Sequence, residues 1–308
     1  MIVYKSNKNF FGDIRHLFTS WTLRKVMNGV LLSGVYTAII CIPALQIDAI
    51  EIESLDIVVF SFLGFVLGIL LVFRTNTAYD RWWEGRKQWG ALVNHCRNLA
   101  IQLNVVIPSD DRESRNYFAR QISNFCFAFK EHLRHGTKIE ELIGLSENEV
   151  QKYQSLSHVP AHISMEIQQR VQDMYKSDVI TGFDSRNIKP HTQALLDILG
   201  ACERIKKTPI PFSYAVFIKI FILAYAFLLP FSLVDIFGWG TVLINMAVMF
   251  AFLGMELMAD EIEEPFGLDC NDLPTGTIAT NISQNIFEIF GIKSAVSSEK
   301  PELYQKIF

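Results

Sequence analysis

Residues 57–73, IVVFSFLGFVLGILLVF, carry no formal charge, and the stretch RTNTAYDRWWEGRKQWG that follows at 74–90 contains four basic residues and three tryptophans. An uncharged run that ends in basic residues and tryptophans is typical of a helix that leaves a membrane at the headgroup layer. Half of the 308 residues are hydrophobic, which is too apolar for a chain of this size that must cover itself with a water-facing surface. We therefore expect an integral membrane protein, with Trp82, Trp83 and Trp89 at the headgroups.

Four stretches are long and apolar enough to cross a hydrocarbon layer of about 30 Å, which takes about 20 helical residues. Two lie within residues 26–73, and two lie within 209–259, separated only by the turn DIFGWG at 235–240. The second span is short, so it must extend at its ends, thin the bilayer or be shielded by other protein. Pro230 falls near the end of the third span, where we expect it to kink or stop the helix.

The distribution of basic residues around the spans predicts their orientation. Five lysines and arginines lie within residues 1–25, whereas the loop DAIEIESLD at 48–56 has four acids and no base. We therefore place both termini in the cytoplasm. The predicted organisation is a cytoplasmic amino-terminal segment (1–25), two spans (26–73), a cytoplasmic helical region (74–208), two further spans (209–259) and a cytoplasmic acidic turn with the carboxyl-terminal tail (260–308).

Residues 74–208 contain no span, and their apolar residues recur at helical spacing, which predicts a cytoplasmic helical bundle. Breaks between its helices are expected at a turn with a helix cap formed by Pro108, Ser109 and Asp110, and around Gly136, Gly144, Pro160 and Gly182. The predicted fold class is an all-α membrane protein with four transmembrane helices and a cytoplasmic bundle.

Composition and motifs disfavour several classes of function. The formal net charge is only −4, with acids and bases alternating, so we expect no nucleic-acid partner. Five scattered cysteines without a CxxC pair indicate reduced thiols. No GxxxxGK, GxGxxG, HExxH or GxSxG motif is present, so we do not expect an enzyme.

The spacings of His132 with His135 and of His158 with His162 are compatible with a metal, but a solvated helix surface is the simpler interpretation, and Pro160 interrupts the helix of the second pair.

Two ionisable residues lie inside the predicted spans, Lys219 in the third and Glu256 in the fourth. Such groups are costly in hydrocarbon and are therefore candidates for an ion-coupling pair. A snorkelling lysine and a carboxylate near the inner headgroups explain them more simply.

In the second span Phe65, Ile69 and Phe73 recur every four residues, and Gly64 and Gly68 form a GxxxG pattern that lets another helix approach closely. On pattern alone, a bulky stripe of this kind is typical of a lipid-facing or core surface. If several copies of the chain surround an axis, the same side chains form an apolar constriction that gates by dewetting.

The segment DEIEEPFGLDCNDLP at 260–274 follows the fourth span and contains six acids. Dense carboxylates on a turn shaped by proline and glycine can hold calcium, although no EF-hand spacing is present. A solvated acidic helix end fits the segment equally well.

Four motifs, in this order and spacing, resemble the bestrophin family of channels and in particular its bacterial branch. They are LGFVLGILLVFR at 63–74, RWWEGRKQWG at 81–90, ACERIKKTPIPFSY at 201–214 and EEPFGLDCNDLP at 263–274, and the resemblance extends to about residue 275. It implies a homopentamer with one pore on the five-fold axis, embedded in the lipid of a bacterial inner membrane and passing small inorganic ions.

The resemblance also implies roles for particular residues. The hydrophobic neck of the family falls on Phe65, Ile69 and Phe73, and a second cytoplasmic constriction falls near Ile180. The calcium clasp of animal members falls on the turn after the fourth span. Asp269 and Asp272 match two of its acidic positions, but the acidic run is interrupted, so we expect a subunit clasp rather than a calcium cofactor.

The resemblance leaves the permeant ion open, because animal bestrophins pass chloride and other anions while the bacterial branch includes members that pass monovalent cations. An apolar neck selects weakly by sign, so charges along the vestibules decide. The negative net charge and the outer-loop acids favour a sodium-type cation channel. These acids are Asp48, Glu51, Glu53 and Asp56. The alternatives are a chloride channel, a coupled transporter that uses Lys219 and Glu256, and a membrane-anchored enzyme or scaffold, for which the sequence offers no site.

Overall fold

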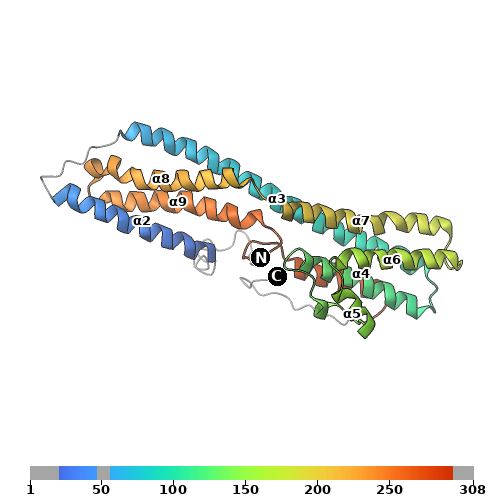
Figure 1. Cartoon of the computed structure of the whole chain (residues 1–308). Coiled ribbons are helices and arrows are strands. Elements are labelled where there is room, and N and C mark those ends of the chain that lie inside the picture. The colour runs from blue at the N-terminus through green and yellow to red at the C-terminus, as the bar shows by residue number, and fades with distance from the viewer. Residues whose placement is uncertain (1–20, 47–55, 294–308) are drawn as a thin grey trace. The chain divides into compact units, whose positions relative to one another are not determined.

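The computed structural model describes residues 21–46 and 56–293, and every regular element within these ranges is a helix (Figure 1). The helices are α2 (Trp21–Gln46), α3 (Ile57–Val106), α4 (Arg112–His132), the single 3-10 turn η2 (Ile139–Glu141), α5 (Glu147–Gln154), α6 (Val159–Lys176), α7 (Gly182–Lys207), α8 (Phe212–Phe237), α9 (Gly240–Glu263) and α10 (Thr275–Ile289). They form two compact units. The membrane unit contains α2, α3 up to Trp82, α8 and α9, and the bundle unit contains α3 from Trp83 together with α4 to α7 and α10.

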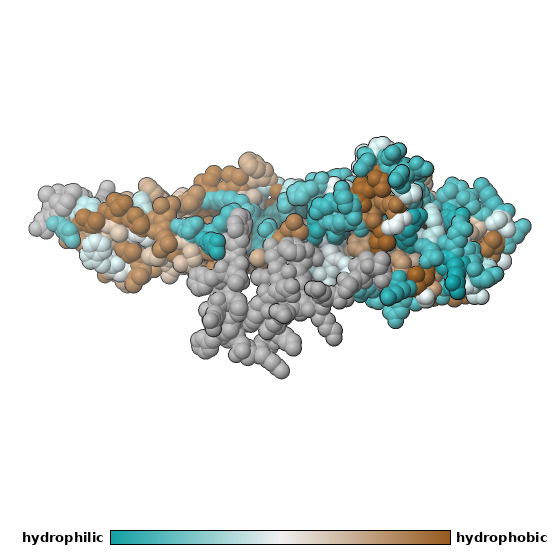
Figure 2. Space-filling model, turned by 90° about the horizontal axis from the view of Figure 1, so that it is seen from below, coloured by the Kyte–Doolittle hydropathy of each residue, from teal (hydrophilic) through white to brown (hydrophobic). Residues whose placement is uncertain are grey.

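Four helices of the described chain, α2, α3, α8 and α9, are long and apolar enough to cross a membrane. The expectation of an all-α membrane protein with four spans is therefore confirmed. Within the membrane unit, α2, α8 and α9 pack against one another. Figure 2 shows hydrophobic side chains gathered on the outer surface of the spans. The interior is filled by aliphatic side chains, among them Leu67, Leu71, Ile218, Ile222 and Leu229.

The second span is the first part of a much longer helix. α3 has 50 residues, which corresponds to about 75 Å at a rise of about 1.5 Å per residue. A bilayer core needs only about 30 Å of this length. The span looks short in the sequence because charged residues begin at Arg74. The helix itself does not end there and continues to Val106.

Pro230 does not stop its helix, in contrast to one of the two expectations stated above. α8 continues beyond it to Phe237 and ends at Gly238, which has a positive φ of 51°. Proline removes a single backbone donor, and packing of neighbouring helices can compensate for this inside a membrane protein. Pro230 is itself buried in the membrane unit.

The basic residues before residue 21 and the acids at 48, 51 and 53, on which the predicted orientation depends, lie outside the described residues.

Helices of the bundle unit begin and end close to the predicted breaks, with two corrections. The cap of α4 is Asp111, the residue after the turn of Pro108, Ser109 and Asp110 in which a cap was expected, and its carboxylate accepts a hydrogen bond from the Ser114 amide at 2.9 Å. Pro160 lies in the first turn of α6 and does not interrupt it, since the first helical residues have no intrahelical partner for an N–H. Gly136 and Gly144 occupy turns with φ of 111° and 61°, where glycine is favoured.

Trp89 does not lie at the headgroups as expected but in the core of the bundle unit. Its side chain is fully buried, and its ring stacks on Phe129 of α4 with centroids 5.1 Å apart and planes 7° from parallel. By contrast, Trp83 is 47% exposed. Trp89 thus joins the second half of α3 to α4.

We expect the substitution Trp89→Ala to lower the free energy of unfolding by about 3–5 kcal/mol, because it removes a buried aromatic side chain and leaves a cavity. Phe183→Ala is a suitable control, since Phe183 is 73% exposed in the same unit, and a surface substitution typically changes stability by no more than about 0.5 kcal/mol. The measurement is a denaturant titration of the detergent-solubilised protein followed by circular dichroism. Equal effects of the two substitutions would contradict the assignment of Trp89 to the core.

Candidate functional site

The stripe Phe65, Ile69 and Phe73 lies on the outer face of α3. These side chains are 66%, 40% and 61% exposed in the single chain, whereas Leu67 and Leu71 on the same helix are fully buried. α3 therefore has one face that packs within the membrane unit and one apolar face that the described residues, 21–46 and 56–293, do not cover. A face of this kind must meet lipid, another subunit or a narrow pore.

The two glycines of the GxxxG pattern have different surroundings. A Cβ atom on Gly64 would lie 2.7 Å from the hydroxyl oxygen of Tyr225, so this glycine contacts the tip of a side chain of α8 and not the α8 backbone. The Tyr225 hydroxyl donates to the carbonyl of Phe60 at 3.2 Å. A Cβ atom on Gly68 would meet nothing within 4 Å. The Tyr225 side chain therefore occupies the space beside Gly64, and the described chain leaves Gly68 open.

Asp80 is a polar continuation of the stripe that the motif analysis did not single out. At about 100° per residue, Asn76 and Asp80 fall within the arc of α3 defined by Phe65 and Phe73. Both are exposed, and no ion pair of Asp80 is found among the described residues. Asp80 follows Phe73 by seven residues, which is about two helical turns, and this helical spacing would have identified the carboxylate. Asp80 is thus a carboxylate on the same exposed arc of α3 as the stripe.

Arg74 is fully buried at the centre of an ionic cluster in the membrane unit. Its guanidinium group lies 3.5 Å from Glu256, 3.0 Å from Asp260 and 2.7 Å from Glu263. These three carboxylates recur at spacings of four and three residues and so lie on one face of α9. Glu263 also accepts a hydrogen bond from the amide of Ile210 at 2.6 Å. A charge removed from water is costly unless it is paired, so the cluster holds α3 against α9.

Lys219 and Glu256, the predicted intramembrane pair, belong to this cluster but are not primarily each other's partners. The Lys219 ammonium lies 3.1 Å from Asp260 and 3.9 Å from Glu256. Glu256 is 1% exposed and lies closer to Arg74, whereas Lys219 and Asp260 are each 43% exposed. The sequence analysis missed this role of Arg74 because the residue stands at the end of an uncharged run and was assigned to the membrane boundary.

The segment expected to hold a second constriction lies between α6 and α7. Ile180 is 4% exposed and packs inside the bundle unit, whereas its neighbours Val179 and Phe183 are 41% and 73% exposed. Within a single chain, the accessible apolar side chains of this segment are therefore Val179 and Phe183. Thr181 caps α7 through a capping box with Asp184.

Asp269 and Asp272 form a small hydrogen-bonded turn. The Asp272 carboxylate, which is 2% exposed, accepts a hydrogen bond from the Asp269 amide at 2.6 Å. The Asp269 side chain is exposed. Among the described residues, no group of three His, Cys, Asp or Glu ligands gathers at this turn. The geometry of the single chain accounts for Asp272 as a turn-stabilising residue.

Comparison with known proteins agrees with this architecture. A family model described as "Bacterial/Fungal Bestrophin protein" matches residues 1–288. A voltage-dependent anion channel-forming protein of Nostoc sp. is 37% identical over 284 residues, which cover 88% of this chain and 92% of that protein. A protein of the same description from Synechocystis sp. is 38% identical over 228 residues, covering 73% of this chain and 74% of that protein.

Solved structures lead to the same group. The crystal structure of a bacterial bestrophin homologue from Klebsiella pneumoniae matches with a TM-score of 0.79 at 26% identity, covering 87% of this chain and 99% of that chain. The resemblance seen in the four motifs is thereby confirmed, and with it the expectation of a channel-family protein rather than an enzyme.

We expect Arg74→Gln to lower the free energy of unfolding by about 3–5 kcal/mol, because it leaves buried carboxylates without their cation. Lys219→Gln removes a positive charge from the same cluster at a half-exposed position, where an ion pair contributes about 0–1 kcal/mol. SDS titration of detergent-solubilised protein compares the two substitutions. If Lys219→Gln proved as destabilising as Arg74→Gln, Arg74 would not be the central cation of the cluster.

Proposed function

Because this chain belongs to the bacterial/fungal bestrophin family, we propose that it forms a homopentameric ion channel whose pore is lined by α3. The observation that carries the proposal is the uncovered apolar face of α3, where Phe65, Ile69 and Phe73 are exposed opposite a fully buried face. If this face of α3 contacted lipid, it would not need bulky side chains at a regular spacing of four residues. A five-fold arrangement would form three rings along a central neck, each made of five copies of one of these side chains.

Such a neck would control the passage of ions through hydration. Aromatic and aliphatic side chains offer no ligands to replace the water around an ion, so a narrow apolar ring dewets and blocks conduction until it widens. The open surface at Gly68, next to the stripe, is suited to close approach of a neighbouring helix. We place the bundle unit and both termini on the cytoplasmic side of a bacterial inner membrane, as the distribution of basic residues predicts.

Anions are the proposed permeant ions. Relatives from Nostoc sp. and Synechocystis sp. are described as voltage-dependent anion channel-forming proteins, and this supports the chloride alternative more than the sodium-type preference. The cation preference depended on outer-loop acids, of which those at 48, 51 and 53 lie outside the described residues. Asp80 would oppose the permeation of anions, because a ring of five carboxylates on the cytoplasmic side of the neck would repel them. We therefore expect a pore whose anion preference Asp80 weakens.

A second constriction and a subunit clasp are further parts of the proposal. In the segment before α7, exposed Val179 or Phe183 is better suited to narrow a pore than buried Ile180. The turn with Asp269 and Asp272 would contact a neighbouring subunit through its exposed Asp269. The alternative of a coupled transporter is less well supported, because Lys219 pairs with Asp260 and Glu256 with Arg74.

Replacing Phe65, Ile69 and Phe73 together with alanine should widen the neck and raise single-channel conductance in planar bilayers. A barrier lower by about 1.4 kcal/mol corresponds to an increase of about tenfold. The matched control is the triple alanine variant of Ile220, Leu223 and Phe227, which are exposed to a similar extent on α8. Native mass spectrometry first establishes that each preparation is a pentamer. Unchanged currents in a pentameric neck variant would contradict the proposed pore.

The reversal potential of the purified protein under a chloride salt gradient tests the permeant ion. In the wild type we expect a reversal potential with the sign of the chloride equilibrium potential. In Asp80→Asn we expect the reversal potential to shift further toward the chloride equilibrium potential, because the substitution removes five negative charges from the proposed ion path. Asp235→Asn changes an exposed carboxylate of α8 and should leave the potential unchanged. A wild-type potential of the opposite sign would overturn the anion proposal, and an Asp80→Asn variant without a shift would place Asp80 away from the pore.

A further inference from the structure

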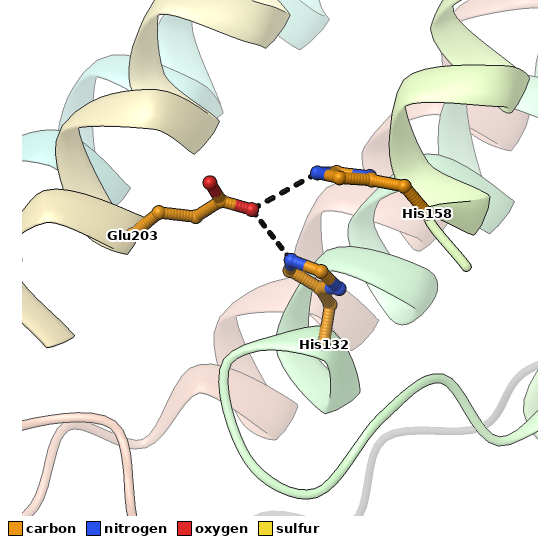
Figure 3. A group of neighbouring side chains, drawn as sticks. All are labelled: His132, His158 and Glu203. Carbon is orange, nitrogen blue, oxygen red and sulfur yellow. Dashed lines mark hydrogen bonds and ion pairs between the residues drawn. The ribbon is translucent and has the colours of Figure 1, made fainter. Parts of the chain in front are cut away.

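Two histidines and a glutamate from three helices of the bundle unit converge on one point (Figure 3). His132 is the last residue of α4, His158 caps the start of α6, and Glu203 lies near the end of α7. The Nε2 atoms of the two histidines lie 2.6 Å and 2.9 Å from the same carboxylate oxygen, Oε1 of Glu203. The two rings stack with centroids 4.3 Å apart.

The fold thus combines one histidine from each of the two sequence pairs. Helical spacing associated His132 with His135 and His158 with His162, but the group of metal-ligand side chains that forms is His132, His158 and Glu203. The partner that completes it, Glu203, lies 45 residues from the nearer histidine. No local spacing could have identified a group of this kind.

We propose that His132, His158 and Glu203 bind a divalent first-row transition metal ion, for which zinc is the best match. Two imidazole nitrogens and one carboxylate oxygen are an established donor set for such ions, and open zinc sites combine three protein ligands with a water molecule. Calcium and magnesium prefer oxygen ligands throughout. In the part of the chain that the structure describes, no other group of three or more His, Cys, Asp or Glu residues has its donor atoms within 4.8 Å of one another.

The distances require only a small adjustment to admit an ion. Tetrahedral zinc bonds of about 2.0–2.1 Å place neighbouring donor atoms roughly 3.3 Å apart. The present separations of 2.6 Å and 2.9 Å would therefore increase by roughly 0.7 Å and 0.4 Å, with rotation of the stacked rings. Lys207 lies 3.3 Å from the other carboxylate oxygen, Oε2, and leaves Oε1 to the imidazoles. The side chains of His132 and Glu203 are 20% exposed and that of His158 is 38% exposed, so an ion reaches them from solvent.

Binding would also change the hydrogen bond that His158 makes as a helix cap. Its Nδ1 accepts a long hydrogen bond of 3.3 Å from the amide of Ala161, which places the proton of the neutral ring on Nε2. A metal at Nε2 requires the lone pair of that atom, so the proton must move through solvent to Nδ1 and the contact with Ala161 is lost. The metal then replaces the cap in holding the start of α6 to α4 and α7.

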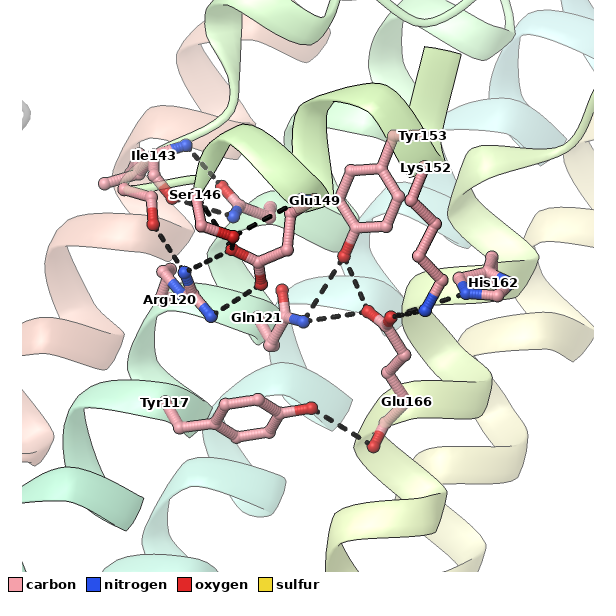
Figure 4. Close-up of polar contacts among 12 residues, drawn as sticks. Tyr117, Arg120, Gln121, Ile143, Ser146, Glu149, Lys152, Tyr153, His162 and Glu166 are labelled. Atoms are coloured by element: carbon pink, nitrogen blue, oxygen red, sulfur yellow. Dashed lines mark hydrogen bonds and ion pairs between the residues drawn. The ribbon is translucent and has the colours of Figure 1, made fainter. Parts of the chain in front are cut away.

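A second histidine–glutamate pair in the same unit provides a control (Figure 4). His162 Nε2 lies 3.3 Å from Oε1 of Glu166. The carboxylate of Glu166 is already occupied by Lys152 at 2.7 Å, by the hydroxyl of Tyr153 at 2.6 Å and by the amide of Gln121 at 2.9 Å. With one imidazole and a saturated carboxylate, this pair is not a metal site by the same criteria.

The test uses the full-length, detergent-solubilised protein after removal of metals with EDTA. Titration with Co²⁺ should produce the visible absorption of a low-symmetry cobalt site with one ion per chain, and Zn²⁺ should displace it. Glu203→Gln keeps an oxygen acceptor for both imidazoles and so favours normal folding, but it should weaken Co²⁺ and Zn²⁺ binding at least about tenfold, since even outer-shell changes cost about 10–100-fold. His132→Ala and His158→Ala should weaken binding as strongly, and His162→Ala should leave it unchanged.

Thermal unfolding gives an independent measurement on the same samples. Zn²⁺ should raise the unfolding temperature of the wild type and of His162→Ala, because a ligand that binds the folded state stabilises it, and at the same zinc concentration it should raise that of Glu203→Gln by less. Absence of the cobalt spectrum in the wild type would overturn the proposal. Equal weakening by His162→Ala and by the three ligand substitutions would also overturn it, because binding would then be distributed over surface histidines.

Discussion

The buried guanidinium of Arg74 is the interaction on which the arrangement of the membrane unit depends. A charge cannot remain unpaired in an apolar interior, and the carboxylates that pair with it recur along one face of α9. The rotation of α3 relative to α9 is therefore restricted to the orientation in which these groups meet. Lys219 adds α8 to the same cluster through Asp260.

This restriction determines which face of α3 remains exposed in the single chain. With Arg74, Leu67 and Leu71 turned inward, Phe65 and Phe73 are turned outward. The uncovered stripe is thus a consequence of charge pairing on the opposite side of the helix. Because α3 continues without interruption beyond the apolar run, the same face carries first apolar and then polar side chains, and Asn76 and Asp80 follow the stripe within about two helical turns. In the proposed pentamer, an apolar neck and a charged ring would act in series, the first on hydration and the second on the sign of the ion.

Two partly exposed carboxylates of the bundle unit, Glu166 and Glu203, differ in their neighbours. Glu166 accepts hydrogen bonds from Lys152, Tyr153 and Gln121 (Figure 4). At Glu203 the donors around one oxygen are two imidazoles, which are also metal ligands. The difference between a saturated carboxylate and a candidate metal site in the same helical bundle therefore lies in the identity of the neighbouring side chains.

Local patterns in the sequence were sufficient for the parts of this protein that depend on single helices. The four spans, the main breaks of the bundle and the periodicity of the Phe65 stripe follow from hydropathy, glycine, proline and helical spacing, which act over a few turns. Family motifs added the identity of the chain. Tertiary structure alone decided that Trp89 is a core residue stacked on Phe129, that Arg74 is the partner of Glu256, and that His132 meets His158 and Glu203. These are contacts between helices distant in sequence, and the burial and pairing of a side chain depend on which neighbour the packing brings to it.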